Sequence, residues 1–175
     1  YDKTVQYPFG YGLSYTEFEQ KMGELEEKDG QISVDVEVTN TGDVAGKDVV
    51  EVYYKPPYTN GGIEKSSANL IEFEKTNLLQ PGESQTVTVT FSIEDMASYD
   101  ENNAKAYVLE KGDYVISINS DSHTVLDQKT YTADKDVVYK GENKRASEND
   151  TAATNVFEDA KGDVTYLSRA DHFAN

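Results

Sequence analysis

The chain has 175 residues, with 33 acidic and 16 basic side chains and a formal net charge of −17. Such a chain, with no basic stripe, is a poor partner for nucleic acid or for anionic membrane surfaces. It has no cysteine, which excludes disulfides and thiolate chemistry, and no apolar run near the roughly 18 residues of a membrane helix.

Apolar and polar residues alternate along much of the chain, as is typical of half-buried strands. A less regular strand is expected within 15–27 and an extended stretch within 70–79. The clearer strands are expected at 32–38, 50–54, 87–93, 107–109, 114–118 and 124–131. Acidic residues at the outward positions of these strands are interpreted as solvated, including the group Glu17, Glu19, Glu24, Glu26 and Glu27.

Turn signals separate these strands, at 40–43, at Pro56-Pro57 and at 80–83, and only one helical turn is expected, at 94–99. Short strands without long helices predict an all-β fold, an antiparallel β-sandwich of immunoglobulin or fibronectin type III-like architecture with irregular N- and C-terminal extensions. We place the sandwich at 17–133, with an extension before it at 1–16 and another after it at 134–175.

One side chain is predicted to brace a turn of the sandwich. Glu110-Lys111-Gly112-Asp113-Tyr114 has the spacing of a tyrosine corner, in which the Tyr114 hydroxyl bonds to nearby backbone. The alternative is that Tyr114 merely begins a strand.

The alternation dissolves from Asp134 onward. Residues 140–155 are polar and are interpreted as a linker or a surface-hugging arm. Residues 156–175 regain apolar side chains but are too few for a core, so they would dock on another body or on the sandwich itself.

A catalytic constellation is not evident. The only histidines, His123 and His172, lie far apart in sequence, and Asp121-Ser122-His123 cannot act as a triad if these neighbours lie on an extended segment. No acidic cluster has the spacing of a calcium loop, although a fortuitous ion stays possible. We expect no catalytic residue, no cofactor and no metal site, and a soluble protein that is either bacterial cytoplasmic or secreted.

Several motifs are far more informative about the protein family than the composition is. Tyr7 to Thr16 (YPFGYGLSYT) resembles the segment that closes the α/β sandwich domain of glycoside hydrolase family 3 enzymes, the β-glucosidase family, and leads into their fibronectin type III-like domain. The resemblance continues to Tyr131 through 38–53, Pro81-Gly82-Glu83 and Gly112-Asp113-Tyr114, and residues 157–169 are similar to the lead-in to the catalytic barrel in members with permuted order.

The resemblance implies the middle of such an enzyme, between the end of the α/β sandwich domain (1–16) and a barrel that follows the linker (134–175). The parent would hydrolyse terminal β-D-glucosyl or related residues with retention. Its aspartate nucleophile would lie after Asn175 and its acid/base carboxylate before Tyr1, so this chain would be a non-catalytic module that holds the two domains in register.

Apolar residues near both ends are the candidates for contact with those domains. They are Pro8, Phe9, Tyr11, Leu13 and Tyr15 on one side and Phe157, Val164, Tyr166 and Leu167 on the other. Packing on the sandwich's own core is the alternative. The loop 58–65 could reach carbohydrate in a neighbouring active site, or a dimer partner. The 13 tyrosines keep an independent carbohydrate-binding module open, although the absence of tryptophan weakens it.

Overall fold

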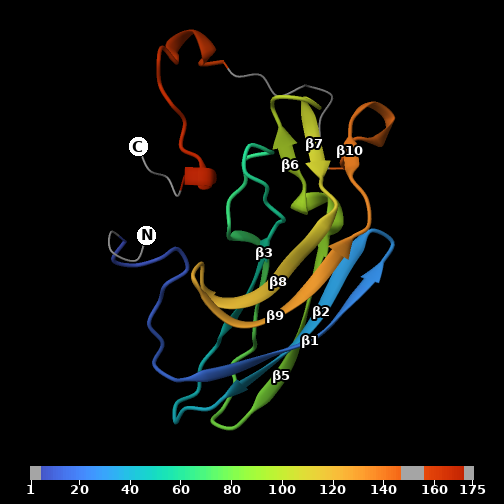
Figure 1. The fold of residues 1–175 in the computed structure, drawn as a ribbon. Helices are drawn as coiled ribbons and strands as arrows, with labels where there is room; N and C mark the ends of the chain where they lie inside the picture. The colour runs from blue at the N-terminus through green and yellow to red at the C-terminus, as the bar shows by residue number, and fades with distance from the viewer. Residues whose placement is uncertain (1–4, 147–155, 172–175) are drawn as a thin grey trace.

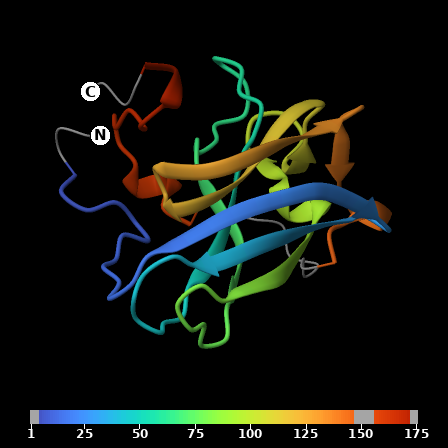
Figure 2. The ribbon, with the colours of Figure 1, turned by 90° about the horizontal axis from the view of Figure 1, so that it is seen from below.

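The computed structural model describes residues 5–146 and 156–171. Its main body is two facing antiparallel sheets (Figure 1). One has the strand order β1-β2-β5 and the other β4-β3-β8-β9, with a small sheet β10-β7-β6 at one end of the sandwich. Viewed from below, the β8–β9 hairpin lies over the layer formed by β1 and β2 (Figure 2).

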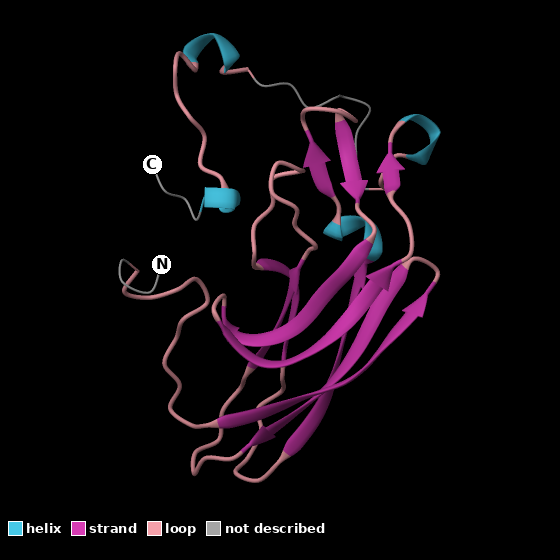
Figure 3. Ribbon diagram, in the orientation of Figure 1, coloured by secondary structure: helices cyan, strands magenta, loops and turns pink. Residues whose placement is uncertain are grey.

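Strand bounds follow the alternation closely. The strands of the two large sheets are β1 (Phe18–Lys28), β2 (Gln31–Asn40), β3 (Val49–Lys55), β4 (Asn69–Lys75), β5 (Ser84–Ser92), β8 (Gly112–Asp121) and β9 (Thr124–Ala133). The small sheet holds β6 (Ser98–Asp100), β7 (Ala106–Leu109) and β10 (Val137–Tyr139). The remaining elements in the described residues are 3-10 turns at Ile93–Met96, Gly141–Asn143, Glu158–Ala160 and Arg169–Asp171 (Figure 3).

The core lies between the two large sheets. Every second residue of β2 is fully buried, from Ile32 to Val38, while its neighbours Asp35 and Glu37 face solvent. Matching rows come from β5 and from β8, where Tyr114, Ile116 and Ile118 point inward. The predicted all-β antiparallel sandwich is confirmed.

The structure differs from the sequence prediction in three local elements. The helical turn expected at 94–99 is a 3-10 turn that ends at Met96, because Ile93 and Met96 are both buried and lie one 3-10 turn apart. Tyr99 instead belongs to β6. The extended stretch within 70–79 divides into β4 and an irregular segment at 76–78, after which Leu79 pairs with Gly46.

The strand β10, which pairs with β7, was not predicted, because it lies in the segment where the alternation dissolves. A three-residue strand is too short to show a period. Beyond it, residues 140–146 lie against the body, where the Arg145 guanidinium stacks 3.4 Å from the centre of the Tyr107 ring. The remainder of the predicted linker, residues 147–155, lies outside the described residues.

Candidate interdomain surfaces

A buried asparagine joins the N-terminal motif to the sandwich. Asn40, fully buried at the end of β2, donates its amide hydrogens to the carbonyl oxygens of Val44 (2.8 Å) and Leu79 (2.9 Å). Its Oδ1 accepts hydrogen bonds from the Thr16 hydroxyl (2.9 Å) and from the backbone N–H of Gly42 (3.1 Å). This one side chain therefore satisfies polar groups from three separate segments.

Two glycines make room for Thr16 in this network. A Cβ on Gly42 would lie 2.2 Å from the Thr16 hydroxyl oxygen, and one on Gly46 would lie 2.8 Å from its methyl group. In the sequence, Thr16 ends the N-terminal motif, whereas Gly42 and Gly46 follow the second strand. In the structure, Gly42 and Gly46 both lie against the Thr16 side chain. This contact fixes the position at which the N-terminal arm, defined here as residues 5–15, joins β1.

The arm then runs beside the outer face of the β3–β8 pair. The Phe9 carbonyl oxygen accepts a 2.8 Å hydrogen bond from the backbone N–H of Ser122. Gly10 has a φ of +86°, and a Cβ there would lie 2.9 Å from a carboxylate oxygen of Glu51 and 3.3 Å from the Cα of Asp121. The motif's first glycine is thus required both by backbone conformation and by space.

The apolar side chains of the arm face away from the sandwich. Leu13 is 90% and Tyr15 99% exposed, and Phe9 and Tyr11 are also exposed, whereas Pro8 is half-buried. The alternative that the first group of candidates fills the sandwich core does not hold for the four exposed residues. The arm presents apolar side chains to its surroundings while its backbone is held by Thr16 and Phe9.

The second group of candidates lies on the C-terminal tail, defined here as residues 156–171. Phe157, Val164, Tyr166 and Leu167 are all exposed. The tail contacts the loop 58–65 through Glu64, whose carboxylate accepts hydrogen bonds from the Ser168 hydroxyl (2.9 Å) and the Arg169 backbone N–H (2.8 Å). These donors, the Arg169 N–H most of all, lower the pKa of Glu64.

The loop–tail contact has an aromatic component as well. The Arg169 guanidinium lies 4.6 Å from the centre of the Tyr58 ring, and the Tyr58 hydroxyl donates to Glu64 at 3.3 Å. The docking of the tail on the sandwich, one of the two alternatives for 156–175, therefore occurs through Ser168 and Arg169. Arm and tail lie on the same side of the molecule in both ribbon views (Figures 1 and 2).

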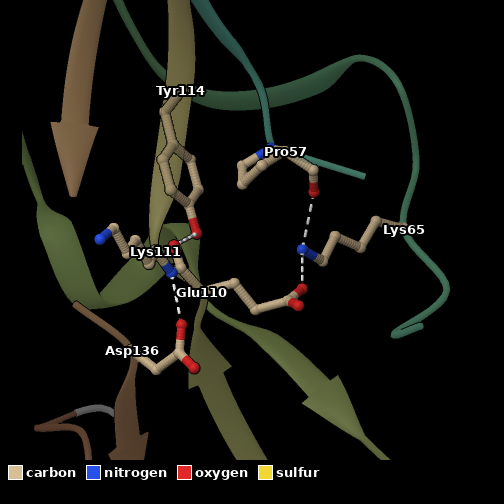
Figure 4. Close-up of polar contacts among 6 residues, drawn as sticks. All are labelled: Pro57, Lys65, Glu110, Lys111, Tyr114 and Asp136. Carbon is tan, nitrogen blue, oxygen red and sulfur yellow. Dashed lines mark hydrogen bonds and ion pairs between the residues drawn. The ribbon is translucent and has the colours of Figure 1, made fainter. Parts of the chain in front are cut away.

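The base of the same loop is anchored at the predicted tyrosine corner (Figure 4). The Tyr114 hydroxyl donates a 3.1 Å hydrogen bond to the Glu110 carbonyl oxygen, which confirms the corner. Lys65, only 7% exposed, donates to the Pro57 carbonyl oxygen at 2.8 Å and forms an ion pair with the Glu110 carboxylate. The Lys65 ammonium group therefore links the loop to Glu110 of the tyrosine corner.

The sequence Asp121-Ser122-His123 forms a hairpin turn instead of the extended segment assumed for it. Asp121 Oδ1 accepts the backbone N–H groups of His123 (2.8 Å) and Thr124 (2.9 Å), and the Ser122 hydroxyl lies 2.8 Å from His123 Nδ1. The carboxylate thus caps the turn between β8 and β9. No group of three or more potential metal ligands occurs in residues 5–146 and 156–171, and His172 lies outside them.

Outward positions of the β3–β8 pair are less solvated than predicted. Glu51 is half-buried and accepts a 3.0 Å hydrogen bond from the Tyr53 hydroxyl. Burial raises the pKa of Glu51, and the nearby negative charges of Asp121 and Asp48 add to this effect. By contrast, the glutamates of the Glu17–Glu27 group are exposed, as expected.

No helix in the described part of the chain is long and apolar enough to cross a membrane.

Part of the sandwich matches a known protein family. Residues 48–122, which run from the start of β3 to the β8–β9 turn, match the family described as fibronectin type III-like domain. The chain contains a fibronectin type III-like domain.

Relatives of the chain are much longer than it is. It is 36% identical over 140 residues to a β-glucosidase of Kluyveromyces marxianus, covering 79% of this chain and 16% of that protein. It is 40% identical over 134 residues to a β-glucosidase of Ruminococcus albus, covering 74% and 14%. The resemblance to family 3 β-glucosidases is thereby confirmed, and the chain spans only a small part of their length.

Solved structures agree with this assignment. The K. marxianus β-glucosidase in complex with glucose superposes with a TM-score of 0.73 at 34% identity, covering 80% of this chain and 17% of that one. The β-glucosidase 3B of Thermotoga neapolitana gives 0.69 at 35% identity, covering 78% and 18%. The fibronectin type III-like domain of this chain therefore has the fold of a segment of those enzymes.

Proposed function

We propose that the chain is a non-catalytic structural module of a family 3 glycoside hydrolase of the β-glucosidase type. In this role it holds an α/β sandwich domain and a catalytic barrel in register. The parent enzyme would hydrolyse terminal β-D-glucosyl or related residues with retention of configuration. The covered fraction of the longer relatives supports a module of a larger enzyme.

One observation carries the register-holding role. The arm backbone is fixed by Thr16 and Phe9, while Leu13 and Tyr15 project away almost fully exposed. Exposed apolar side chains on a fixed backbone suit burial against a neighbouring domain. The spacing of two catalytic carboxylates on separate domains depends on such contacts, because small displacements lower the rate strongly.

The first experiment assays the isolated chain on an aryl β-glucoside. We expect no turnover above a buffer control, since both catalytic carboxylates of the proposed parent enzyme would lie on its other domains. Measurable hydrolysis that copurifies with the chain would overturn the proposal.

A second experiment tests register directly in an enzyme that carries the chain between its two catalytic domains. Leu13→Ser with Tyr15→Ser should lower kcat/KM by about tenfold or more. The control, Val44→Ser, changes an exposed apolar residue of the β2–β3 loop and should have little effect. Equal activity of the arm variant and the control would contradict the role.

A further inference from the structure

The loop between β3 and β4 carries a chemically labile pair of residues at its tip. Asn60 is the only asparagine in the sequence that a glycine follows. Asparagine is thermolabile, and it can lose ammonia without an enzyme when the next backbone nitrogen attacks its side-chain carbonyl carbon. A Cβ on the next residue hinders that attack and restricts the backbone, so a following glycine makes the reaction faster.

The fold leaves this pair accessible. The whole turn at residues 59–62 is exposed, and a Cβ on Gly61 would have no atom within 4 Å. The Gly62 N–H donates to the Thr59 carbonyl oxygen (2.9 Å), so this bond does not involve the Gly61 nitrogen that would attack. Because the turn is exposed, water can replace the bond while the backbone rotates to bring the Gly61 nitrogen to the Asn60 side chain.

The fold protects other asparagines. The nitrogens that would attack Asn102 and Asn103 both donate to the Asp100 carboxylate, from the Asn103 N–H (3.0 Å) and from the Ala104 N–H (2.9 Å). Asn119 lies within β8 and is only 2% exposed. The loop tip therefore differs from these positions both in sequence and in backbone freedom.

We propose that Asn60 is a site of spontaneous deamidation in the folded protein. The Gly61 nitrogen forms a bond to Asn60 Cγ, the Cγ–Nδ2 bond breaks, and the side-chain nitrogen leaves as ammonia with the proton that the Gly61 nitrogen has lost. Water then opens the cyclic succinimide at either of its carbonyl carbons. One opening leaves an aspartyl residue at position 60, and the other leaves an isoaspartyl residue, whose main chain contains an additional carbon atom.

The modification changes the tip of the loop and not its base. Both products add a negative charge, and the isoaspartyl product lengthens the turn that the Thr59–Gly62 hydrogen bond closes. Lys65 anchors the base of the loop through Pro57 and Glu110, so β3 and β4 need not move. Hydrolysis of the succinimide does not restore the amide, so the modified fraction increases with the age of the chain. The reaction needs the loop and water alone, and is therefore independent of the proposed structural role.

Incubation of the whole chain at neutral pH and physiological temperature, followed by peptide mapping with mass spectrometry, tests the proposal. We expect aspartate and isoaspartate to accumulate at position 60 at least about tenfold faster than at Asn102 or Asn103. The rate at Asn60 in the folded chain should be at least about a tenth of its rate in urea, because an exposed turn opens without global unfolding.

Variants assign the reaction to this pair of residues. Gly61→Ala should slow it about tenfold or more, because the added Cβ hinders the attacking nitrogen. Gly82→Ala is the matched control, since Gly82 also has a φ of +79° and open space around its added Cβ, and it should leave the rate at Asn60 unchanged. Asn60→Gln keeps a side-chain amide but would need a larger ring, so it should remove the reaction at this position.

Three outcomes would overturn the proposal: no product at position 60 in the folded chain after prolonged incubation, equal rates in Gly61→Ala and Gly82→Ala, or modification of Asn102 and Asn103 as fast as that of Asn60. None of these bears on glucoside hydrolysis or on domain register. A failure here is therefore distinguishable from a failure of the proposed function.

Discussion

The Thr16 hydroxyl donates a 2.9 Å hydrogen bond to Oδ1 of Asn40, a residue 24 positions later in the chain. This bond joins the last residue of the N-terminal motif to the end of β2. It gives a physical reason for the threonine at position 16 and for the glycines at Gly42 and Gly46, which surround Thr16. It also explains how the arm can be fixed in direction while most of its side chains make no contact with the core.

Replacing Asn40 should destabilise the domain strongly. Asn40→Ala removes four hydrogen bonds of a fully buried side chain, so we expect a loss of about 2–3 kcal/mol in the free energy of unfolding. Urea unfolding measures this loss. Asn77→Ala, which has the same change at an exposed site, should stay within about 0.5 kcal/mol. Similar midpoints for the two variants would refute the account.

Gly10 should be required for attachment of the arm. Gly10→Ala adds a Cβ against Glu51 and strains a backbone of positive φ, so the Phe9–Ser122 hydrogen bond should break. Hydrogen exchange at the Ser122 amide should become at least about tenfold faster, an opening equilibrium shifted by roughly 1.4 kcal/mol. Gly12→Ala is the matched control, because no atom lies within 4 Å of its added Cβ. Unchanged Ser122 exchange in Gly10→Ala would be contrary to this role.

Two ion pairs, Lys65–Glu110 and Lys129–Glu24, should differ in their contribution to stability. Lys65→Met leaves the Pro57 carbonyl oxygen and the Glu110 carboxylate without the buried ammonium group, and we expect a loss of about 2 kcal/mol, reduced because Glu110 is partly solvated. Lys129 pairs with the exposed Glu24, so Lys129→Met should cost much less than Lys65→Met. Thermal or urea unfolding compares them, and equal losses would argue against a structural role for Lys65.

Stability should fall in alkaline solution. Burial raises the pKa of Tyr114, and burial together with the hydrogen bond to Glu51 raises that of Tyr53. Both phenols stay protonated in the folded chain, whereas in the unfolded chain they ionise near the ordinary value of about 10. Their contribution is therefore present below about pH 10 and is lost as pH rises above it.

Urea unfolding over this range, with an absorbance titration of the folded chain, measures the effect. At least five phenols should titrate late, because burial also raises the pKa values of Tyr54, Tyr131 and Tyr139. Two of the late phenols should disappear from the titration in a chain with Tyr53→Phe and Tyr114→Phe. If all phenols of the folded chain titrated together near pH 10, the expected pH dependence would be wrong.

Alternation was sufficient to predict the central strands, because Val and Ile at every second position of β2 and β5 can bury only one face. The tyrosine corner was predictable for a similar reason, since local spacing determines which carbonyl the Tyr114 hydroxyl reaches. Strands of three residues, such as β6 and β10, contain too few positions to show a period. They depend on tertiary pairing with β7.

The sequence did not predict which segments pack on the outer face of the β4-β3-β8-β9 sheet. Glu51 occupies a position that alternation interprets as solvated, yet Gly10 of the arm lies against its carboxylate. Period 2 shows which residues share a face but not what packs on it. The roles of Asn40 and Thr16 were hidden similarly, because their meeting depends on sheet register.

The anchoring of Lys65 has a further consequence for the connection between β3 and β4. Residues 56–68 are closed at their base by Lys65, so only the tip around Gly61 behaves as a free loop. Gly61 has open space around it. Loop-closure entropy rises slowly with length, by about 0.6 kcal/mol per doubling. Extra residues inserted between Asn60 and Gly61 should therefore cost little, which makes this tip a place where the domain can accept new sequence without moving its strands.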